Sequence, residues 1–399
     1  MSETLADTDR LTKPPGGFQE KSSIRRLQWA EAATGIDLSK PLVPSSEDLR
    51  GIIENHVTSL PLPMAVAGPL VIDGTYAKGD FIVPVCTVEG TLVLSMTRGM
   101  MAFAQSGGCK TVHLRQELSR SPGFIMPSIS DIPSFIDWVM FHEDLIRQVA
   151  ESTTRYGKLL RIEAVPLQNF VILDFVYDTA NAAGQNMVTI ATEAACRMIQ
   201  EKTGHDYFLE SGYNSDKKPS RRNFADGRGH GVVMEVNLPE HVLDYMGVTA
   251  SKILQFQQMA QVSSHAMGGL GTNLHAANGL TALYLAFGQD AACVAENAVA
   301  ISQAFPAENN GLLCRMTFPS LTVGTVGGGT RLPAQRRNLE MVGCAEGEHS
   351  SRKLAEIIAA ASAALEFSLL AAVVSGTFAQ AHASYGRNKK TVVSDSQII

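Results

Sequence analysis

Cysteine pairs and metal-binding spacings are missing from this sequence of 399 residues. None of its six cysteines stands in a CxxC pair, and none is spaced with the ten histidines as zinc ligands are. Charged residues make up only 18% of the chain and the net charge is -6, so the basic surface that nucleic acids require is lacking. The first residues are polar and acidic, so no signal peptide is expected. We therefore expect a cytoplasmic protein with reduced thiols, no metal site and no nucleic-acid partner.

Long apolar runs are also scarce. The segment from Leu354 to Ala381 is long enough to cross a bilayer, because it consists mostly of alanine, leucine, valine and small residues. It also contains Glu356 and Glu366, and alanine is a weak membrane anchor. A helix that is apolar on nearly all faces is equally typical of the interior of a large protein or of a subunit interface. We expect a buried helix here.

The most informative stretch is the charged loop, residues 214–222, with the sequence NSDKKPSRR. It holds five charges in nine residues, and Pro219 prevents it from continuing as a helix. One interpretation is a solvated surface turn. In the other, Asp216 orients a lysine whose ammonium group faces an anion or a carbonyl oxygen that becomes an oxyanion.

Two further acids have two possible roles each. Glu89 stands between an expected strand, Phe81 to Cys86, and an expected helix, Gly90 to Ala104. It is either a first-turn charge that favours the helix, or a buried acid with a raised pKa that donates a proton. Asp290 falls inside an expected apolar helix, His275 to Ala300, where an unpaired carboxylate is costly. A lysine of the charged loop is a plausible partner for it.

Two glycine-containing segments indicate close approach of a ligand to the backbone. Residues 181–187 read NAAGQNM at a strand-to-helix junction, where backbone amides can accept phosphates. Residues 324–330 read GTVGGGT, which is neither a GxGxxG motif nor a P-loop. Residues 1–22 are expected to form a loose arm. A helix–strand–helix pattern from Ser121 to Glu210 indicates an inserted subdomain.

Together these segments resemble hydroxymethylglutaryl-CoA (HMG-CoA) reductase, in a soluble class I form without a membrane anchor. The resemblance runs from about residue 54 to 388, and the DKKP form of the charged loop is typical of class I. It is carried by LPLPMAVAGPL (60–70), TVEGTL (87–92), NSDKKP (214–219), HAAN (275–278), GQDAA (288–292), GTVGGGT (324–330) and a tail with His382.

The resemblance implies an α+β fold with a large domain around a long buried central helix and a smaller inserted α/β domain. It assigns residues 1–53 to an arm and a small helical region, and 54–120 and 223–399 to the large substrate-binding domain with a mobile tail. Residues 121–210 form the small NADP(H)-binding domain, and 211–222 form the catalytic lysine loop. The implied reaction is the four-electron reduction of HMG-CoA to mevalonate and CoA by two NADPH, in a homodimer or higher homo-oligomer with active sites at the subunit interface.

The resemblance also assigns four catalytic residues whose roles agree with the chemistry. Lys217 stabilises the oxyanion that the first hydride creates. His382 protonates the departing thiolate, unless it merely caps the preceding helix. Glu89 gives a proton to the final alkoxide. Asp290, placed between Lys217 and Glu89, holds the lysine charged and raises the pKa of the glutamate.

The implied binding residues match the family less completely. Gln258 and Met101 stand where the family has basic residues for the acyl carboxylate and for CoA, and the cofactor motif DAMGMNM appears as NAAGQNM. A reductase of another acyl thioester is therefore an alternative, and a catalytically idle binding protein is a more distant one. The implied substrate-binding residues are Ser95, Arg98, Arg120, Ser211, Asp216, Lys218, His275 and Asn278. The implied cofactor-binding residues are Thr154, Arg155, Tyr156, Asn181, Asn186, Gly327, Gly328, Gly329 and Thr330, and the first three favour NADPH over NADH.

If His382 protonates the thiolate, His382→Gln harms thioester reduction and largely spares reduction of the free aldehyde, which has no leaving group. General acid catalysis contributes roughly 10²–10⁴-fold in rate, so the two activities should separate widely. Parallel assays with the acyl-CoA and the corresponding aldehyde measure this separation. Equal losses on both substrates would leave His382 as part of the scaffold.

Overall fold

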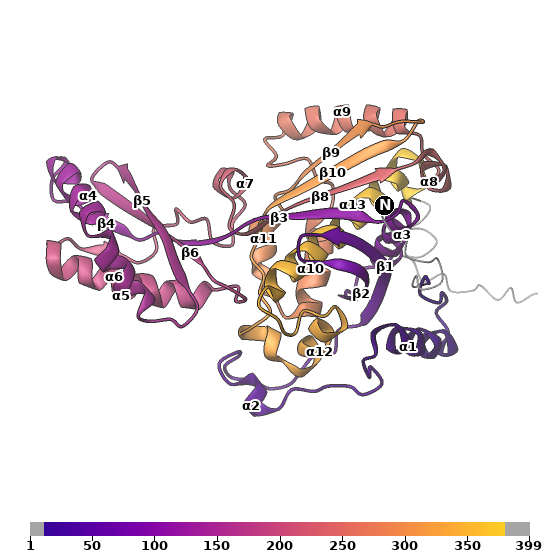
Figure 1. The fold of residues 1–399 in the computed structure, drawn as a ribbon, viewed down its shortest axis with the longest axis horizontal. Helices are drawn as coiled ribbons and strands as arrows, with labels where there is room; N and C mark the ends of the chain where they lie inside the picture. Colours follow the sequence, from indigo (N-terminus) through magenta and orange to yellow (C-terminus); the bar gives the residue numbers. More distant parts are fainter. Residues whose placement is uncertain (1–11, 380–399) are drawn as a thin grey trace, which may run out of the picture.

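The computed structural model describes residues 12–379, which form a large unit and a smaller unit joined by one long strand (Figure 1). That strand is β3 (Cys109–Arg120). Its residues 110–117 pair with β8 (Gly229–Leu238) in the large unit, and residues 118–120 pair with β6 (Phe170–Asp178) in the smaller unit. Because both units share one strand, the geometry between them is set by a continuous backbone ladder.

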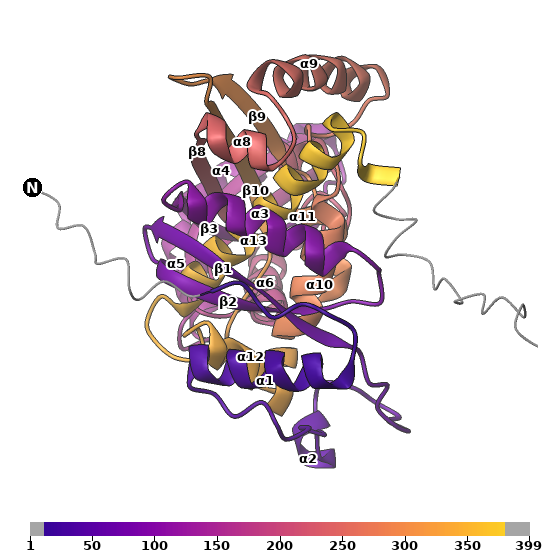
Figure 2. The ribbon, with the colours of Figure 1, turned by 90° about the vertical axis from the view of Figure 1, so that its right-hand side faces the viewer.

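The sheet of the large unit has the order β2-β1-β3-β8-β10-β9, in which only β1 and β3 are parallel. The helices cover its faces and its lower edge (Figure 2). Its remaining elements are β1 (Met64–Gly74), β2 (Lys78–Cys86), β9 (Ile301–Pro306), β10 (Leu312–Leu321), α1 (Glu20–Thr34), α2 (Ser46–Leu49), α3 (Leu92–Gln105), α7 (Arg221–Ala225), α8 (Glu240–Tyr245), α9 (Ala250–Ala266), α10 (Ala276–Phe287), α11 (Val294–Asn297), α12 (Pro333–Met341) and α13 (Ser350–Val374).

The smaller unit has its own hydrophobic core, formed by buried residues between Leu118 and Ile199. Helices α5 and α6 pack on one another and on the sheet. Its elements are β4 (Gly123–Ile125), β5 (Lys158–Leu167), β6, β7 (Tyr207–Phe208), α4 (Ile132–Phe141), α5 (Glu143–Glu151) and α6 (Gln185–Thr203). The mixture of helices and a largely antiparallel sheet confirms the predicted α+β class.

Helix α13 is the centre of the large unit. Twenty of its 25 residues are buried, and α3 and α10 pack against it. The crossing with α3 is very close, since a Cβ atom at Gly99 would lie 1.8 Å from the carbonyl oxygen of Ala364. Within the described residues it is also the one helix that is long and apolar enough to span a membrane, and 83% of that window is buried inside the protein. The predicted buried helix is therefore confirmed, although it begins at Ser350 and ends at Val374.

The predicted long helix from His275 to Ala300 is wrong. Helix α10 ends at Phe287, because Gly288 adopts a left-handed φ of 68°. A side chain could not fit there, since a Cβ atom would lie 2.4 Å from the carbonyl oxygen of Gly329. Asp290 therefore lies in a loop beyond the helix, and the central helix of the fold is α13 instead.

Two other local predictions are also corrected. Residues 12–22 are not a loose arm: α1 begins at Glu20, and the guanidinium of Arg26 donates hydrogen bonds to the carbonyl oxygens of Pro15 and Gly17. The sequence from His241 to Val262 also predicts a single helical segment, but it is divided into α8 and α9, because the chain turns at Gly247, which has a φ of 73°.

Two buried carboxylates on α13 bind backbone amides of neighbouring turns. Glu356 accepts from the N–H groups of Tyr76 (3.0 Å) and Ala77 (2.7 Å) in the β1–β2 turn. Glu366 accepts from the N–H groups of Leu274 (2.9 Å) and His275, just before α10. These bonds compensate part of the cost of burying each charge and fix both turns to the central helix.

Burial raises the pKa of Glu366 to about 7, although its two backbone hydrogen bonds act in the opposite direction. Because the folded-state pKa is the higher one, the folded protein binds a proton that the unfolded chain releases. Stability from this group is therefore present at low pH and is lost as pH rises from about 4.5 to about 7.

The Glu366→Gln variant lacks this titrating group. Between pH 4.5 and 7.5 we therefore expect the unfolding free energy of the unmutated protein to fall by roughly 3 kcal/mol relative to that of Glu366→Gln. Urea unfolding of both proteins across this range measures it. Glu308→Gln, at an exposed site, is the control and should show no such change. A difference that does not vary with pH would contradict the prediction.

Candidate active site

Lys217 and Asp290 form the central ion pair of the site. The Lys217 ammonium lies 2.9 Å from the Asp290 carboxylate, and about half of each side chain is exposed. This hydrogen bond is the main cause of a raised pKa of Lys217, which keeps the ammonium protonated at neutral pH. The predicted pairing of Asp290 with a lysine of the charged loop is confirmed.

Asp216 contacts a lysine of the charged loop through its backbone and not through its carboxylate. Its carboxylate faces two arginines instead: Arg120 at 3.7 Å and Arg228 at 3.7 Å. Only its backbone carbonyl contacts a lysine side chain, that of Lys218, at 3.0 Å. Asp216 therefore joins the charged loop to the arginines beneath it.

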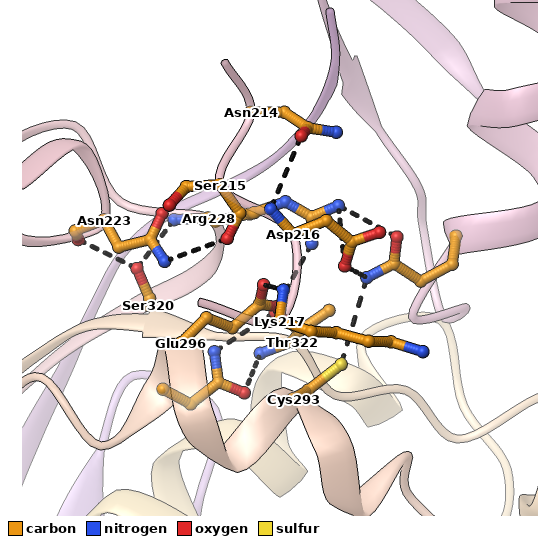
Figure 3. A network of polar contacts seen from close by, with 12 residues as sticks. Asn214, Ser215, Asp216, Lys217, Asn223, Arg228, Cys293, Glu296, Ser320 and Thr322 are labelled. Atoms are coloured by element: carbon orange, nitrogen blue, oxygen red, sulfur yellow. Dashed lines mark hydrogen bonds and ion pairs between the residues drawn. The ribbon is translucent and has the colours of Figure 1, made fainter. Parts of the chain in front are cut away.

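A buried ion pair anchors the backbone of the charged loop (Figure 3). The guanidinium of Arg228 donates to Glu296 at 3.1 Å, and both side chains are almost fully excluded from water. The other Glu296 oxygen accepts the backbone N–H of Lys217 at 2.7 Å. Lys217 has a left-handed φ of 57°, which is unfavourable for a residue with a side chain and has to be held by such contacts.

Arg228 and Glu296 are functional candidates that the sequence predictions missed. The available signals were weak: Arg228 lies between two glycines, and Glu296 is a single acid in the otherwise uncharged stretch 291–300. Neither residue type nor spacing predicts that the two meet. The contact becomes evident only when β8 and α11 are placed side by side.

A second group of predicted residues lines a cavity of about 260 Å³ at the first turns of α3 and α10. The amide of Asn278 donates to the carboxylate of Glu89 at 3.3 Å and lies 3.4 Å from the ring nitrogen Nδ1 of His275. The rest of the wall is partly apolar, with Leu365 and Leu369 from α13. The predicted residues that line this cavity are Glu89, Ser95, Arg98, His275 and Asn278.

Neither sequence-based interpretation of Glu89 describes its place in the structure. The helix begins after it, at Leu92, with Thr91 in the N-cap position, so Glu89 is not a first-turn charge. Its side chain is exposed in this chain rather than buried. Asp290 contacts Lys217 and Glu89 contacts Asn278, and no hydrogen bond among residues 12–379 connects Glu89 with Asp290.

Other predicted substrate residues are already engaged by the protein. Arg120 is buried and pairs with Glu210. Arg98 donates to the hydroxyl and the backbone carbonyl of Ser368 on α13, at 3.0 and 2.5 Å. The Ser211 hydroxyl donates to the carbonyl of Ser121 at 2.6 Å. These bonds position the side chains and leave part of each arginine's donor capacity for a ligand.

The two predicted glycine segments lie side by side. The carbonyl of Asn181 accepts the backbone N–H of Thr325 at 2.8 Å, and Ala182 and Val326 form a parallel β-bridge. A Cβ atom at Gly324 would lie 2.2 Å from the backbone nitrogen of Ala183, so only glycine permits this approach. Beyond it, Gly327 and Gly328 have positive φ and are exposed, which leaves a bare backbone surface.

The glycine segment 324–330 is linked to the Lys217–Asp290 ion pair. The side chain of Gln289 donates to the carbonyl of Gly324 (2.9 Å) and accepts its N–H (2.8 Å). Asp290, the next residue, is thereby fixed relative to the glycine segment. The side chain of Asn181 donates to the carbonyl of Gly347 at 2.8 Å and accepts from the N–H of Ser351 at 3.2 Å, so it holds the first turn of α13.

The remaining predicted cofactor residues lie on the smaller unit. Thr154 precedes β5, where its hydroxyl accepts the N–H of Gly157 at 3.1 Å and shapes the loop. Arg155, Tyr156 and Asn186 are exposed. Within residues 12–379, Arg155 has no ion-pair partner, so its charge is available to an anionic ligand. His382 lies outside the described residues.

Comparisons with known proteins agree with this geometry. The family model of hydroxymethylglutaryl-coenzyme A reductase matches residues 22–387. The chain belongs to this family. It is 39% identical to the 3-hydroxy-3-methylglutaryl-coenzyme A reductase of Methanocaldococcus jannaschii, covering 93% of this chain and 94% of that protein. It is 37% identical to that of Haloferax volcanii, covering 91% and 92%. The predicted family is confirmed.

The fold of this HMG-CoA reductase family member is similar to a solved class II reductase from Streptococcus pneumoniae bound to NADPH in open conformations. The TM-score is 0.70 at 19% sequence identity, covering 88% of this chain and 86% of that one. The likeness supports the predicted fold.

We expect Lys217→Ala to reduce turnover by roughly 10²–10³-fold or more, on both the thioester and the aldehyde, because both reductions develop negative charge on the same oxygen. Oxidation of NADPH followed by absorbance measures it. Lys202→Ala, at an exposed lysine of α6, is the control. Near-normal turnover of Lys217→Ala in a folded protein would remove the lysine from the mechanism.

Proposed function

We propose that the chain reduces HMG-CoA to mevalonate and CoA with two molecules of NADPH, as a step of the mevalonate pathway. The observation that carries the proposal is the Lys217–Asp290 ion pair, fixed beside a bare glycine backbone by Gln289. Hydride addition to a carbonyl places negative charge on its oxygen, and a protonated lysine can stabilise that charge. The exposed glycine backbone next to it is suited to a phosphate-containing cofactor.

The residues around the proposed cofactor site fit NADPH. Exposed backbone at Gly327 and Gly328 permits close approach of a ligand, and Arg155 has a free charge for a 2′-phosphate. NADPH supplies hydride in both reduction steps. Residues 121–210 then form the cofactor-binding unit, and the large unit and the charged loop hold the acyl-CoA.

The protein residues handle charge and protons. Lys217 faces the carbonyl oxygen and stabilises the negative charge that forms on it in each step, while Asp290 holds the ammonium in place. The proposed role of Glu89 is to give a proton to the final alkoxide, with Asn278 orienting its carboxyl group. His382 is the proposed acid for the thiolate.

We propose that two subunits complete each site. In one chain, the Lys217 group and the Glu89 cavity are separate, although the chemistry requires them to act on one carbonyl. Helix α9 has a single buried residue, Ile253, and exposes Met259, Val262 and Met267. A second copy of the chain that covers this apolar face would bring the two groups together and remove the apolar side chains from water.

Two finer assignments belong to the same proposal. The DKKP sequence of the charged loop supports class I, and the protein is expected in the cytoplasm. A reductase of a different acyl thioester is the second candidate, because Gln258 replaces a basic residue. In the structure Gln258 lies on α9 and lines a different hollow from that of Glu89.

We expect NADPH to be oxidised with HMG-CoA, and NADH to be used less well. Arg155→Ala should raise the KM for NADPH by about tenfold and leave that for NADH unchanged, because only NADPH carries the 2′-phosphate. Arg197→Ala, an exposed arginine on the same unit that pairs with Glu193, is the control. Equal use of both cofactors by the unmutated protein would contradict the proposed 2′-phosphate site at Arg155. Activity only with other acyl thioesters would favour the second candidate function.

A further inference from the structure

Gln185 links the proposed cofactor loop to the charged loop. It is the first residue of α6 and lies within the segment 181–187. Its side-chain oxygen accepts from the guanidinium of Arg228 at 2.9 Å, and its nitrogen donates to the carboxylate of Asp216 at 3.4 Å. A weaker contact, at 3.9 Å, reaches the sulfur of Cys293. Its amide therefore contacts three segments of the large unit.

Arg228 has few alternatives to this contact. The side chain is 1% exposed, so its donors depend on protein acceptors. One terminal nitrogen pairs with Glu296, and the other is shared between Gln185 at 2.9 Å and Asp216 at 3.7 Å. The nitrogen Nε has no partner among the described residues. Without Gln185, the second terminal nitrogen would retain only the long contact with Asp216.

The connection continues to the catalytic lysine. Glu296 holds Arg228 with one oxygen and the backbone N–H of Lys217 with the other, and Thr322 donates its hydroxyl to the same carboxylate at 2.5 Å. Figure 3 shows Lys217 next to Glu296, with Arg228 and Asp216 close by. An unbroken series of hydrogen bonds thus runs from the start of α6 to the residue whose left-handed backbone aims the ammonium.

This link depends on the amide group of Gln185, which a methionine of similar length would lack. A thioether cannot donate a hydrogen bond and accepts one only weakly, so it could not satisfy Arg228 and Asp216 together. The contact is thus a property of the chain's own sequence rather than of the fold.

We propose that Gln185 is a positioning residue that couples cofactor binding to the geometry of the charged loop, so that cofactor and acyl-CoA each strengthen the binding of the other. The proposal rests on the proposed function, in which residues 121–210 bind the cofactor and Asn181 and Asn186, on either side of Gln185, are among the implied contacts. A cofactor that orders this loop fixes Gln185 and, through Arg228 and Glu296, the backbone of Lys217. Thermodynamic linkage then requires the same factor of coupling in both directions.

Equilibrium binding of NADP+ to the full chain, with and without saturating HMG-CoA, tests the proposal without turnover. For the unmutated protein we expect the Kd for NADP+ to fall by about fivefold or more when HMG-CoA is present, within the usual range of coupling between sites. In Gln185→Met the ratio of the Kd for NADP+ without HMG-CoA to that with HMG-CoA should approach one. The Kd for NADP+ alone should change by less than about twofold. A simple loss of stability would not lower the ratio selectively.

A matched variant makes the result specific. Gln200→Met changes a glutamine at the far end of α6, where it contacts Asp206, and should match the unmutated protein. A wild-type ratio in Gln185→Met, a ratio near one in the unmutated protein, or a ratio near one in Gln200→Met would each overturn the proposal. Failure of the unmutated protein to oxidise NADPH with HMG-CoA would overturn the proposed function instead, and the binding ratios would still decide the role of Gln185.

Discussion

The proposed site depends on the contacts of one buried carboxylate, that of Glu296. A carboxylate without water needs a cation and several hydrogen bonds, and it obtains them from Arg228, the Lys217 backbone and Thr322. Each of these partners comes from a different segment: the residue before β8, the charged loop and the residue after β10. Burial therefore constrains their positions, because movement of any of the three would remove the ion pair or a hydrogen bond from a buried carboxylate.

The same constraint appears twice more, on the central helix. Glu356 and Glu366 are buried on α13 and are satisfied by pairs of backbone amides from the β1–β2 turn and from the segment before α10. Through Glu366, the start of α10 is fixed where His275 and Asn278 enter the cavity beside Glu89. Hydrophobic burial gives α13 its place, but these polar contacts determine the register of the turns around it.

Sequence alone was sufficient for features with local causes. The apolar composition of residues 354–381 predicts a buried helix, Pro219 predicts a loop, and a lone aspartate within an apolar stretch predicts a cationic partner for Asp290, although that stretch is not the single helix expected. Where a cause is non-local, prediction fails. The end of α10 at Gly288 results from the close approach of Gly329, and the strand pairings of β3 with β1, β6 and β8 join segments that lie far apart in the sequence.

Three site residues could not be predicted from the sequence for a related reason. Gln185, Arg228 and Glu296 are single polar residues in separate segments, and their function arises only from their meeting. The amide of Gln185, on the smaller unit, lies within hydrogen-bonding distance of both the charged loop and a buried arginine. A side chain at such a junction can change the communication between two binding sites while the catalytic residues remain the same, which is how members of one family can share a reaction and differ in how their ligands cooperate.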